Sequence, residues 1–132
     1  MEPTADGGTV YGGTVKDAIG GNTTNALVVK LAANGNVQWA NALTEIGNSQ
    51  LDKVRQTRDG GYIGIGRMNP SGGNSFVYIV KLNGIGAISW FKGFGSATGS
   101  DYGTDIIELT SGDFAFTGVS DGGLTGKTAL LC

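Results

Sequence analysis

The feature that most constrains this chain is an internal repeat of roughly fifty residues. Residues 57–66 match residues 4–13, and residues 110–118 match both with one residue fewer. A second block, residues 28–39, matches residues 79–90, and both end in tryptophan. Blocks that recur in one order at near-constant spacing indicate a single structural unit, copied about two and a half times. The predicted copies are residues 4–56, residues 57–109 and the partial residues 110–132.

Each copy holds short strand candidates separated by turn residues. In the complete copy the predicted strands are residues 61–67, 75–82, 87–94 and 103–109. Residues 77–80 are a continuous apolar run, which is typical of a strand covered on both faces. Asp59, Gly60 and Gly61 signal a tight turn. No segment shows sustained helical periodicity, so the sequence predicts an all-β protein of antiparallel strands.

The repeat also resembles a known family. Four short antiparallel strands at this period are typical of β-propeller blades. The pattern Thr-x-Asp-Gly-Gly-Tyr-Ile-x-x-Gly, followed by Val-Lys-Leu-x-x-x-Gly and Trp (residues 57–90), resembles the bacterial Asp-Gly-Gly propeller repeats, which are kelch-like in length and occur in large secreted or surface proteins. This resemblance implies a blade with the Asp105 strand innermost and the Trp strand outermost. It also implies a secreted or cell-surface location, which the sequence itself leaves unknown.

Two and a half blades do not close a ring, because propellers usually need four to eight. In the implied strand order, the first blade lacks its inner strand and the last blade lacks its outer strand. Two interpretations remain open: identical chains complete a ring, or the chain is a piece of a longer propeller. We expect self-assembly into a dimer or trimer, since symmetric closure is the common solution for natural oligomers.

Composition excludes several classes of function. The sequence has no histidine and one cysteine, Cys132, so a His/Cys zinc site, a histidine-based triad and an internal disulfide cannot form. Nine Lys and Arg residues are scattered and the net charge is −2, which argues against nucleic-acid binding. The N-terminus lacks a signal-peptide pattern, and no apolar run reaches the length of a membrane span. We expect neither a nucleic-acid nor a membrane partner.

Motifs for cofactors and metals are also missing from the sequence. Gly126, Lys127 and Thr128 form the end of a phosphate-loop pattern, but Asp121 stands where that pattern needs glycine. No twelve-residue calcium loop of alternating acidic residues occurs. The sequence therefore predicts no metal and no cofactor.

Four residues are the candidate ligand-binding positions. Trp39 and Trp90 are equivalent, and one aromatic per blade is first of all a packing element, although sugar-binding propellers also present one. Asp52, matched to Asp105 at a step of 53, opens the presumed innermost strand and could surround a channel mouth. Alternatively, these carboxylates bind backbone N–H groups where blades meet. Further binding residues are expected on the polar loops at residues 15–25, 44–50, 69–74 and 96–101.

These features favour a non-enzymatic binding or interaction module whose ligand, a carbohydrate or a protein, contacts the loops. This hypothesis predicts an open pocket lined by Asn, Ser, Thr and Asp side chains. A purely structural or assembly role is the first alternative. A lectin, or a glycosidase-like enzyme using two carboxylates drawn from Asp52, Asp105 and Glu108, is the second.

Overall fold

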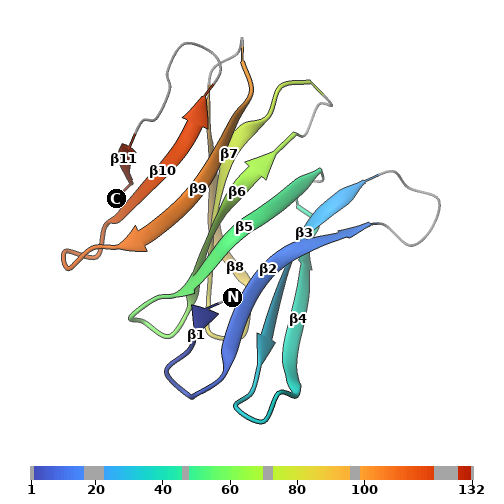
Figure 1. Ribbon diagram of the computed structural model, residues 1–132, viewed down its shortest axis with the longest axis vertical. Helices are drawn as coiled ribbons and strands as arrows, with labels where there is room; N and C mark the ends of the chain where they lie inside the picture. The colour runs from blue at the N-terminus through green and yellow to red at the C-terminus, as the bar shows by residue number, and fades with distance from the viewer. Residues whose placement is uncertain are drawn as a thin grey trace.

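The computed structural model describes residues 2–16, 23–45, 48–69, 73–95, 99–120 and the backbone of residues 128–131. These segments form antiparallel sheets and no helix (Figure 1), which confirms the all-β prediction. None of the described segments forms a helix long and apolar enough to cross a membrane.

Three sheets lie side by side, and in each the strands pair in chain order. The first sheet contains β1 (Glu2–Pro3), β2 (Thr9–Lys16), β3 (Thr24–Leu31) and β4 (Val37–Leu43). The middle sheet contains β5 (Ser49–Gln56), β6 (Tyr62–Met68), β7 (Phe76–Leu82) and β8 (Ile88–Phe94). The third sheet contains β9 (Asp101–Glu108), β10 (Phe114–Ser120) and β11 (Thr128–Leu131).

The strand bounds of the complete copy agree with the predicted ones to within about two residues. One strand was not expected. The first sheet has a two-residue edge strand, β1, beside β2, a position at which the sequence predicts no strand. The middle and third sheets therefore begin with the strand that closes one sequence copy and continue with strands of the next.

The middle sheet is packed on both faces, with β5 against β2 and β6 against β9. Along β7, Tyr78 and Val80 belong to the core shared with the first sheet, whereas Val77 and Ile79 belong to the core shared with the third. Alternate side chains of a strand point to opposite faces. The apolar run of β7 thus reflects two covered faces, as the sequence predicts.

The Asp-Gly-Gly turn is explained by one set of contacts between Thr57, Asp59, Gly61, Lys81 and Leu82. Asp59 Oδ1 accepts hydrogen bonds from Thr57 Oγ1 at 2.5 Å and from Gly61 N at 2.9 Å. The Lys81 side chain, 10% exposed, places its Nζ 3.1 Å from Asp59 Oδ2 and donates to the Leu82 carbonyl oxygen at 3.0 Å. A nearly buried ammonium needs such partners. The lysine of β7 and the turn aspartate therefore act together, and we call this arrangement the Asp–Lys contact.

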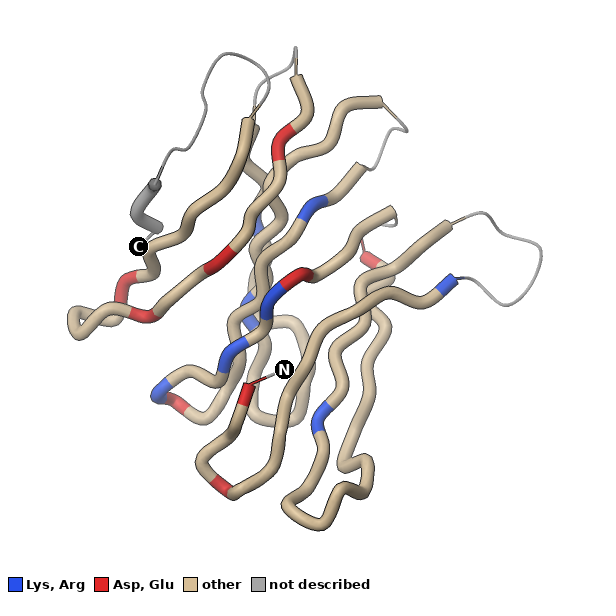
Figure 2. Tube along the Cα trace, viewed as in Figure 1, with Lys and Arg blue, Asp and Glu red and all other residues tan. Residues whose placement is uncertain are grey.

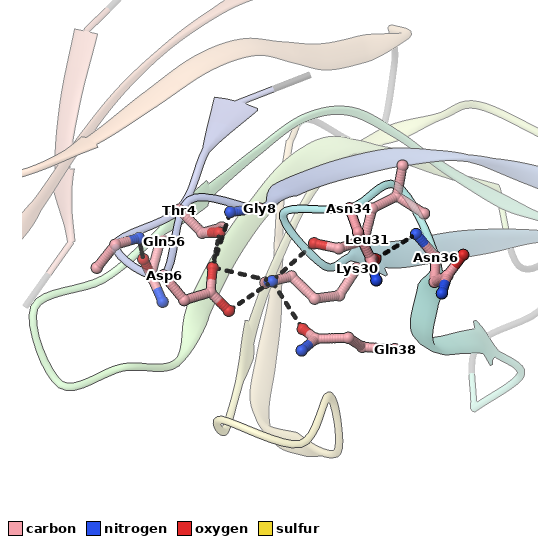
Figure 3. Close-up of polar contacts among 10 residues, drawn as sticks. Thr4, Asp6, Gly8, Lys30, Leu31, Asn34, Asn36, Gln38 and Gln56 are labelled. Carbon is pink, nitrogen blue, oxygen red and sulfur yellow. Dashed lines mark hydrogen bonds and ion pairs between the residues drawn. The ribbon is translucent and has the colours of Figure 1, made fainter.

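The same Asp–Lys contact occurs in the first sheet. Figure 3 shows Lys30 Nζ between the Asp6 carboxylate, the Leu31 carbonyl oxygen and Gln38 Oε1. Thr4 Oγ1 and Gly8 N donate to Asp6 Oδ1, at 2.5 and 3.0 Å. In the middle sheet Lys81 pairs with Ile63, and in the third sheet Leu130 pairs with Ala115, so Leu130 is the equivalent of Lys81. That sheet has no lysine at this register position, and Ser111 replaces the turn aspartate.

The third turn also corrects the sequence alignment. Gly60 and Gly112 have positive φ angles, +84° and +93°, and Leu109 N donates to the Asp113 carbonyl oxygen as Thr57 N does to that of Gly61. The third turn therefore has the same length as the second, and the step between them is 52 throughout. The expectation of one residue fewer was wrong.

The Asp–Lys contact predicts acid sensitivity. Hydrogen bonds from Thr57 and Gly61, and then Lys81, lower the pKa of Asp59 from 3.8 to about 2. Between these values the unfolded chain binds the proton and the folded chain does not, so stability should fall as the pH is lowered through this window. The temperature of thermal unfolding should be lower at about pH 2.5 than at about pH 5, and Asp59→Asn should make this difference smaller. The control Asp52→Asn, which removes a carboxylate outside the contact, should leave it unchanged; an unchanged loss in Asp59→Asn would contradict the prediction.

Candidate functional site

A polar recess of about 820 Å³ lies where the three sheets adjoin. Thr24 of β3, Arg67 of β6 and Tyr102 of β9 line it, so every sheet contributes. Asn48 and Asn69, which flank β5 and β6, add side-chain amides. Its Asn, Ser and Thr side chains are of the kind that the binding-module hypothesis expects, but no aspartate lines this recess among the described residues.

Hydrogen bonds between the sheets fix the strand ends around the recess. Asn48, which has a φ angle of +42°, accepts a hydrogen bond from Thr24 N of the first sheet at its Oδ1, 3.4 Å away. Ser49 Oγ, which is buried, accepts from Ala26 N at 3.1 Å. In the second junction Ser75 Oγ donates to the Asp101 carbonyl oxygen at 2.9 Å. Neighbouring sheets are thus joined at this end by polar groups, which keeps the recess open and polar.

Arg67 is the distinctive side chain of the recess. Its guanidinium carbon lies 5.6 Å from the centre of the Tyr102 ring, a cation–π arrangement. The side chain is exposed, and among the described residues it forms no ion pair with a carboxylate. In the middle sheet Arg67 pairs with Gln50, and in the third sheet Val119 pairs with Tyr102 at the same register position. Val119 is therefore the equivalent of Arg67. Arg67 therefore departs from the repeat.

A second recess of about 390 Å³ adjoins the first, because both are lined by Arg67 and Tyr102. Asp52 and Thr104 also line it. Asp52 Oδ1 accepts a hydrogen bond from Gln50 Nε2 at 3.0 Å. Asp52, a candidate residue from the sequence, therefore lines the smaller recess. Its Oδ1 lies 3.0 Å from Nε2 of Gln50, which lines the larger recess.

The predicted equivalence of Asp52 and Asp105 is wrong by one residue. Leu51 pairs with Gly66 and Lys53 with Ile65, so Asp52 is the extra residue of a β-bulge. The bulged residue of β9 is Thr104, and Asp105 occupies the position of Lys53. A shift of one residue moves a side chain to the opposite face of a strand. Consequently, the two aspartates do not form one ring of equivalent carboxylates.

Asp105 belongs instead to a row of charged residues on the first strands of the three sheets, β1, β5 and β9. Figure 2 shows acidic and basic residues along these strands. Arg55 Nη2 lies 3.0 Å from Asp105 Oδ1, and Arg55 Nη1 lies 3.5 Å from Glu2 Oε2. Asp105 Oδ1 also accepts from the adjacent Ile106 N at 2.8 Å, a local contact within β9 and not one between sheets. Burial alone would raise the pKa of Asp105, but the bonds from Arg55 and Ile106 outweigh it and lower the pKa.

Glu108 joins two sheets through a contact that occurs twice. Its Oε1 accepts from Arg58 N at 2.8 Å and lies 3.4 Å from Arg58 Nε. At the other junction, Gln56 Oε1 accepts from Ala5 N at 2.7 Å. The last residues of β5 and β9 thus each hold the turn of the preceding sheet, which is a structural role.

Both tryptophans pack between sheets. The Trp39 ring lies edge-on to Tyr62, with centroids 5.3 Å apart, and the Trp90 ring meets Phe114 at 6.2 Å. Each is half-buried and joins a hydrophobic core. These are the contacts of the packing interpretation, and neither tryptophan lines the polar recess.

Some sequence expectations lie outside the described residues. They are Cys132, the Gly126 and Lys127 pair, and the inner parts of the four loops, residues 17–22, 46–47, 70–72 and 96–98. Within the described residues, no three acidic, histidine or cysteine side chains gather as metal ligands.

Sequence reasoning missed Arg67 and Tyr102. Both occupy strand positions that were treated as part of the repeat. The signal that could have identified them is that Arg67 and Tyr102 differ in type from Val119 and Gln50, their counterparts in the repeat. The chain matches no protein-family model, and no curated protein is significantly similar to it. Fold and site together define a three-sheet antiparallel β protein with a polar recess between its sheets.

Proposed function

We propose that the chain is a non-enzymatic binding module built from β-propeller-type blades, and that its ligand occupies the polar recess. The observation that carries this proposal is that the residues that join the sheets differ from those that line the recess. Contacts that occur twice, such as Trp39 with Tyr62 and Trp90 with Phe114, join the sheets. Residues that differ between sheets, Arg67 above all, line the recess. Binding residues typically vary over a rigid scaffold in this way.

The way the sheets follow one another supports the propeller arrangement. The same turn-to-strand contact, from Ala5 N to Gln56 and from Arg58 N to Glu108, relates the first sheet to the middle one and the middle one to the third. Repeating one such step around an axis generates a ring of blades with β1, β5 and β9 innermost. The resemblance to bacterial Asp-Gly-Gly propeller repeats points the same way.

The carboxylates favour binding over hydrolysis. A glycosidase needs a carboxylic acid whose pKa is raised so that it keeps its proton. Asp105 has a lowered pKa because of Arg55 and Ile106, and Glu108 is paired with Arg58. These groups hold the sheets together, so we propose no catalytic residue.

A broad binding screen tests the function. Labelled protein on glycan and peptide arrays should retain a defined set of ligands, and Arg67→Gln should abolish or strongly reduce retention. Lys92→Gln is the control, since Lys92 is an exposed cation on the outermost strand β8, beside Trp90. Loss of retention in both variants alike, or no retained ligand for the wild type, would contradict the proposal and favour the purely structural alternative.

Self-assembly is proposed from the two outward faces. In the first sheet, Leu27 is partly exposed and holds the position that Tyr78 holds in the middle sheet, where the first sheet covers it. In the third sheet, Ile107 is 47% exposed and lines a small apolar groove. Burying such faces stabilises by roughly 25 cal/mol per Å². We propose that the first sheet of one copy packs on the third sheet of another.

The expected result is a dimer or trimer in solution. Light scattering at micromolar concentration should give two or three times the mass of one chain. Ile107→Asp should shift the protein to monomer because it places a charge in the interface, whereas Ile85→Asp, at a turn residue 73% exposed, should not. A wild-type monomer would contradict self-assembly and favour the interpretation as a piece of a longer propeller.

A further inference from the structure

The charge of the larger recess comes from a single residue. Of the described residues that line it, only Arg67 is charged at neutral pH, and it has no carboxylate partner among them. Tyr102 supports the planar guanidinium from one side. A guanidinium held in this way presents paired N–H donors that fit a carboxylate or another planar oxyanion. The recess therefore favours a ligand that carries one anionic group.

Apart from Val119, the other described residues of the lining carry neutral hydrogen-bonding groups. Asn48, Gln50 and Asn69 contribute side-chain amides, and Thr24 and Ser49 contribute hydroxyls. Amides and hydroxyls both donate and accept hydrogen bonds. They suit a ligand with many hydroxyl groups, each of which also donates and accepts. The volume of about 820 Å³ is within the range of small-ligand sites.

Asp52 fixes how such a ligand would be oriented. It lines the adjoining recess with Arg67 and accepts a hydrogen bond from Gln50 Nε2. A carboxylate repels a second carboxylate and accepts hydrogen bonds from hydroxyl groups. The anionic group of the ligand therefore approaches Arg67 from the larger recess, and the hydroxyls of a neighbouring unit reach Asp52.

From these contacts we propose that the recess binds an acidic sugar, a hexuronate unit of an oligosaccharide. Its carboxylate pairs with Arg67, and its hydroxyls bind the amides of Asn48, Gln50 and Asn69. This inference rests on the proposed function and names its ligand class. Arg67 is exposed, and none of the contacts that occur twice involves it, so we expect its variants to fold despite the lost contact with Tyr102.

Isothermal titration calorimetry tests the ligand class. The probes are an oligogalacturonate of three units, the same oligomer with its carboxyls methyl-esterified, and inorganic phosphate. We expect the wild type to bind the acid form at least about tenfold more tightly than the ester, since one charge-assisted pair is lost. Arg67→Gln should lower affinity for the acid to that for the ester, Arg67→Lys should retain part of it, and Lys92→Gln should bind like the wild type. Thermal unfolding checks that each variant is folded.

The outcomes separate this inference from the proposed function. Equal binding of acid and ester, or no binding of either by a protein that retains other ligands on the arrays, would overturn the acidic sugar alone. Phosphate bound as tightly as the oligomer would also overturn it, since the site would then recognise a simple oxyanion. A protein that binds neither these probes nor any array ligand would overturn both.

Discussion

Replacing Gly61 with valine should lower the free energy of unfolding by about 3 kcal/mol, the upper range for overpacking at a buried site. A Cβ at this position would lie 2.3 Å from the Leu82 carbonyl oxygen and 2.6 Å from Lys81 Nζ. The first atom is backbone of β7 and cannot move without breaking strand pairing. The second belongs to the Asp–Lys contact, so the substitution also separates Lys81 from Asp59. Urea unfolding followed by tryptophan fluorescence measures the change.

Gly60 provides the matched control in the same turn. Its φ angle is +84°, but a Cβ there meets nothing within 4 Å. Gly60→Ala should therefore cost only the conformational penalty of a left-handed residue, about 1 kcal/mol. Gly61→Ala should cost clearly more than Gly60→Ala. Equal losses in the two alanine variants would show that the turn has only a conformational requirement, and that the close approach of Leu82 is not limiting.

Replacing Trp90 with alanine should destabilise the protein by about 3 kcal/mol, as expected for removal of a large aromatic side chain from a core. The indole packs on Phe114 across the junction of the middle and third sheets, and Lys92 Nζ lies 5.8 Å from the ring centre. Removing the ring leaves a cavity between two sheets and exposes part of Phe114. Chemical denaturation, with Trp39→Ala as the equivalent change at the other junction, gives both losses.

The same variants distinguish packing from sugar binding. If the tryptophans are packing residues, both variants should lose stability and keep any ligand that the wild type binds. A loss below about 1 kcal/mol together with lost carbohydrate binding would instead support the lectin alternative for these rings. Trp90→Phe should recover part of the stability, because a smaller ring can still contact Phe114.

Much of the secondary structure follows from local sequence. Alternation and turn residues place β6, β7 and β8 to within about one residue, since each strand is bounded by its own Gly-containing turn. The unbroken apolar run in β7 correctly predicts two covered faces. The positive φ of Gly60 is likewise a local property, which a tight turn requires.

The candidate site was less predictable, because its members come from different sheets. Asn48 and Asn69 lie within or beside the loops expected to carry binding residues, but Arg67 and Tyr102 lie on strands. Nothing in the local sequence shows that these two side chains will meet across a junction between sheets. The bulge at Asp52 also has no clear sequence signature, and it was enough to shift the alignment with Asp105 by one residue.

Local sequence is enough to predict short antiparallel strands in copies of one unit, because strand period and turn chemistry act over a few residues. Three features depend instead on the tertiary structure: the pairing of Lys81 with Asp59, the link from Glu2 through Arg55 to Asp105, and the recess beside Arg67. Those contacts join residues about 20 to 50 positions apart, and local pattern does not encode such distances. They depend on how neighbouring sheets stack, which is set by the shape and burial of both faces together.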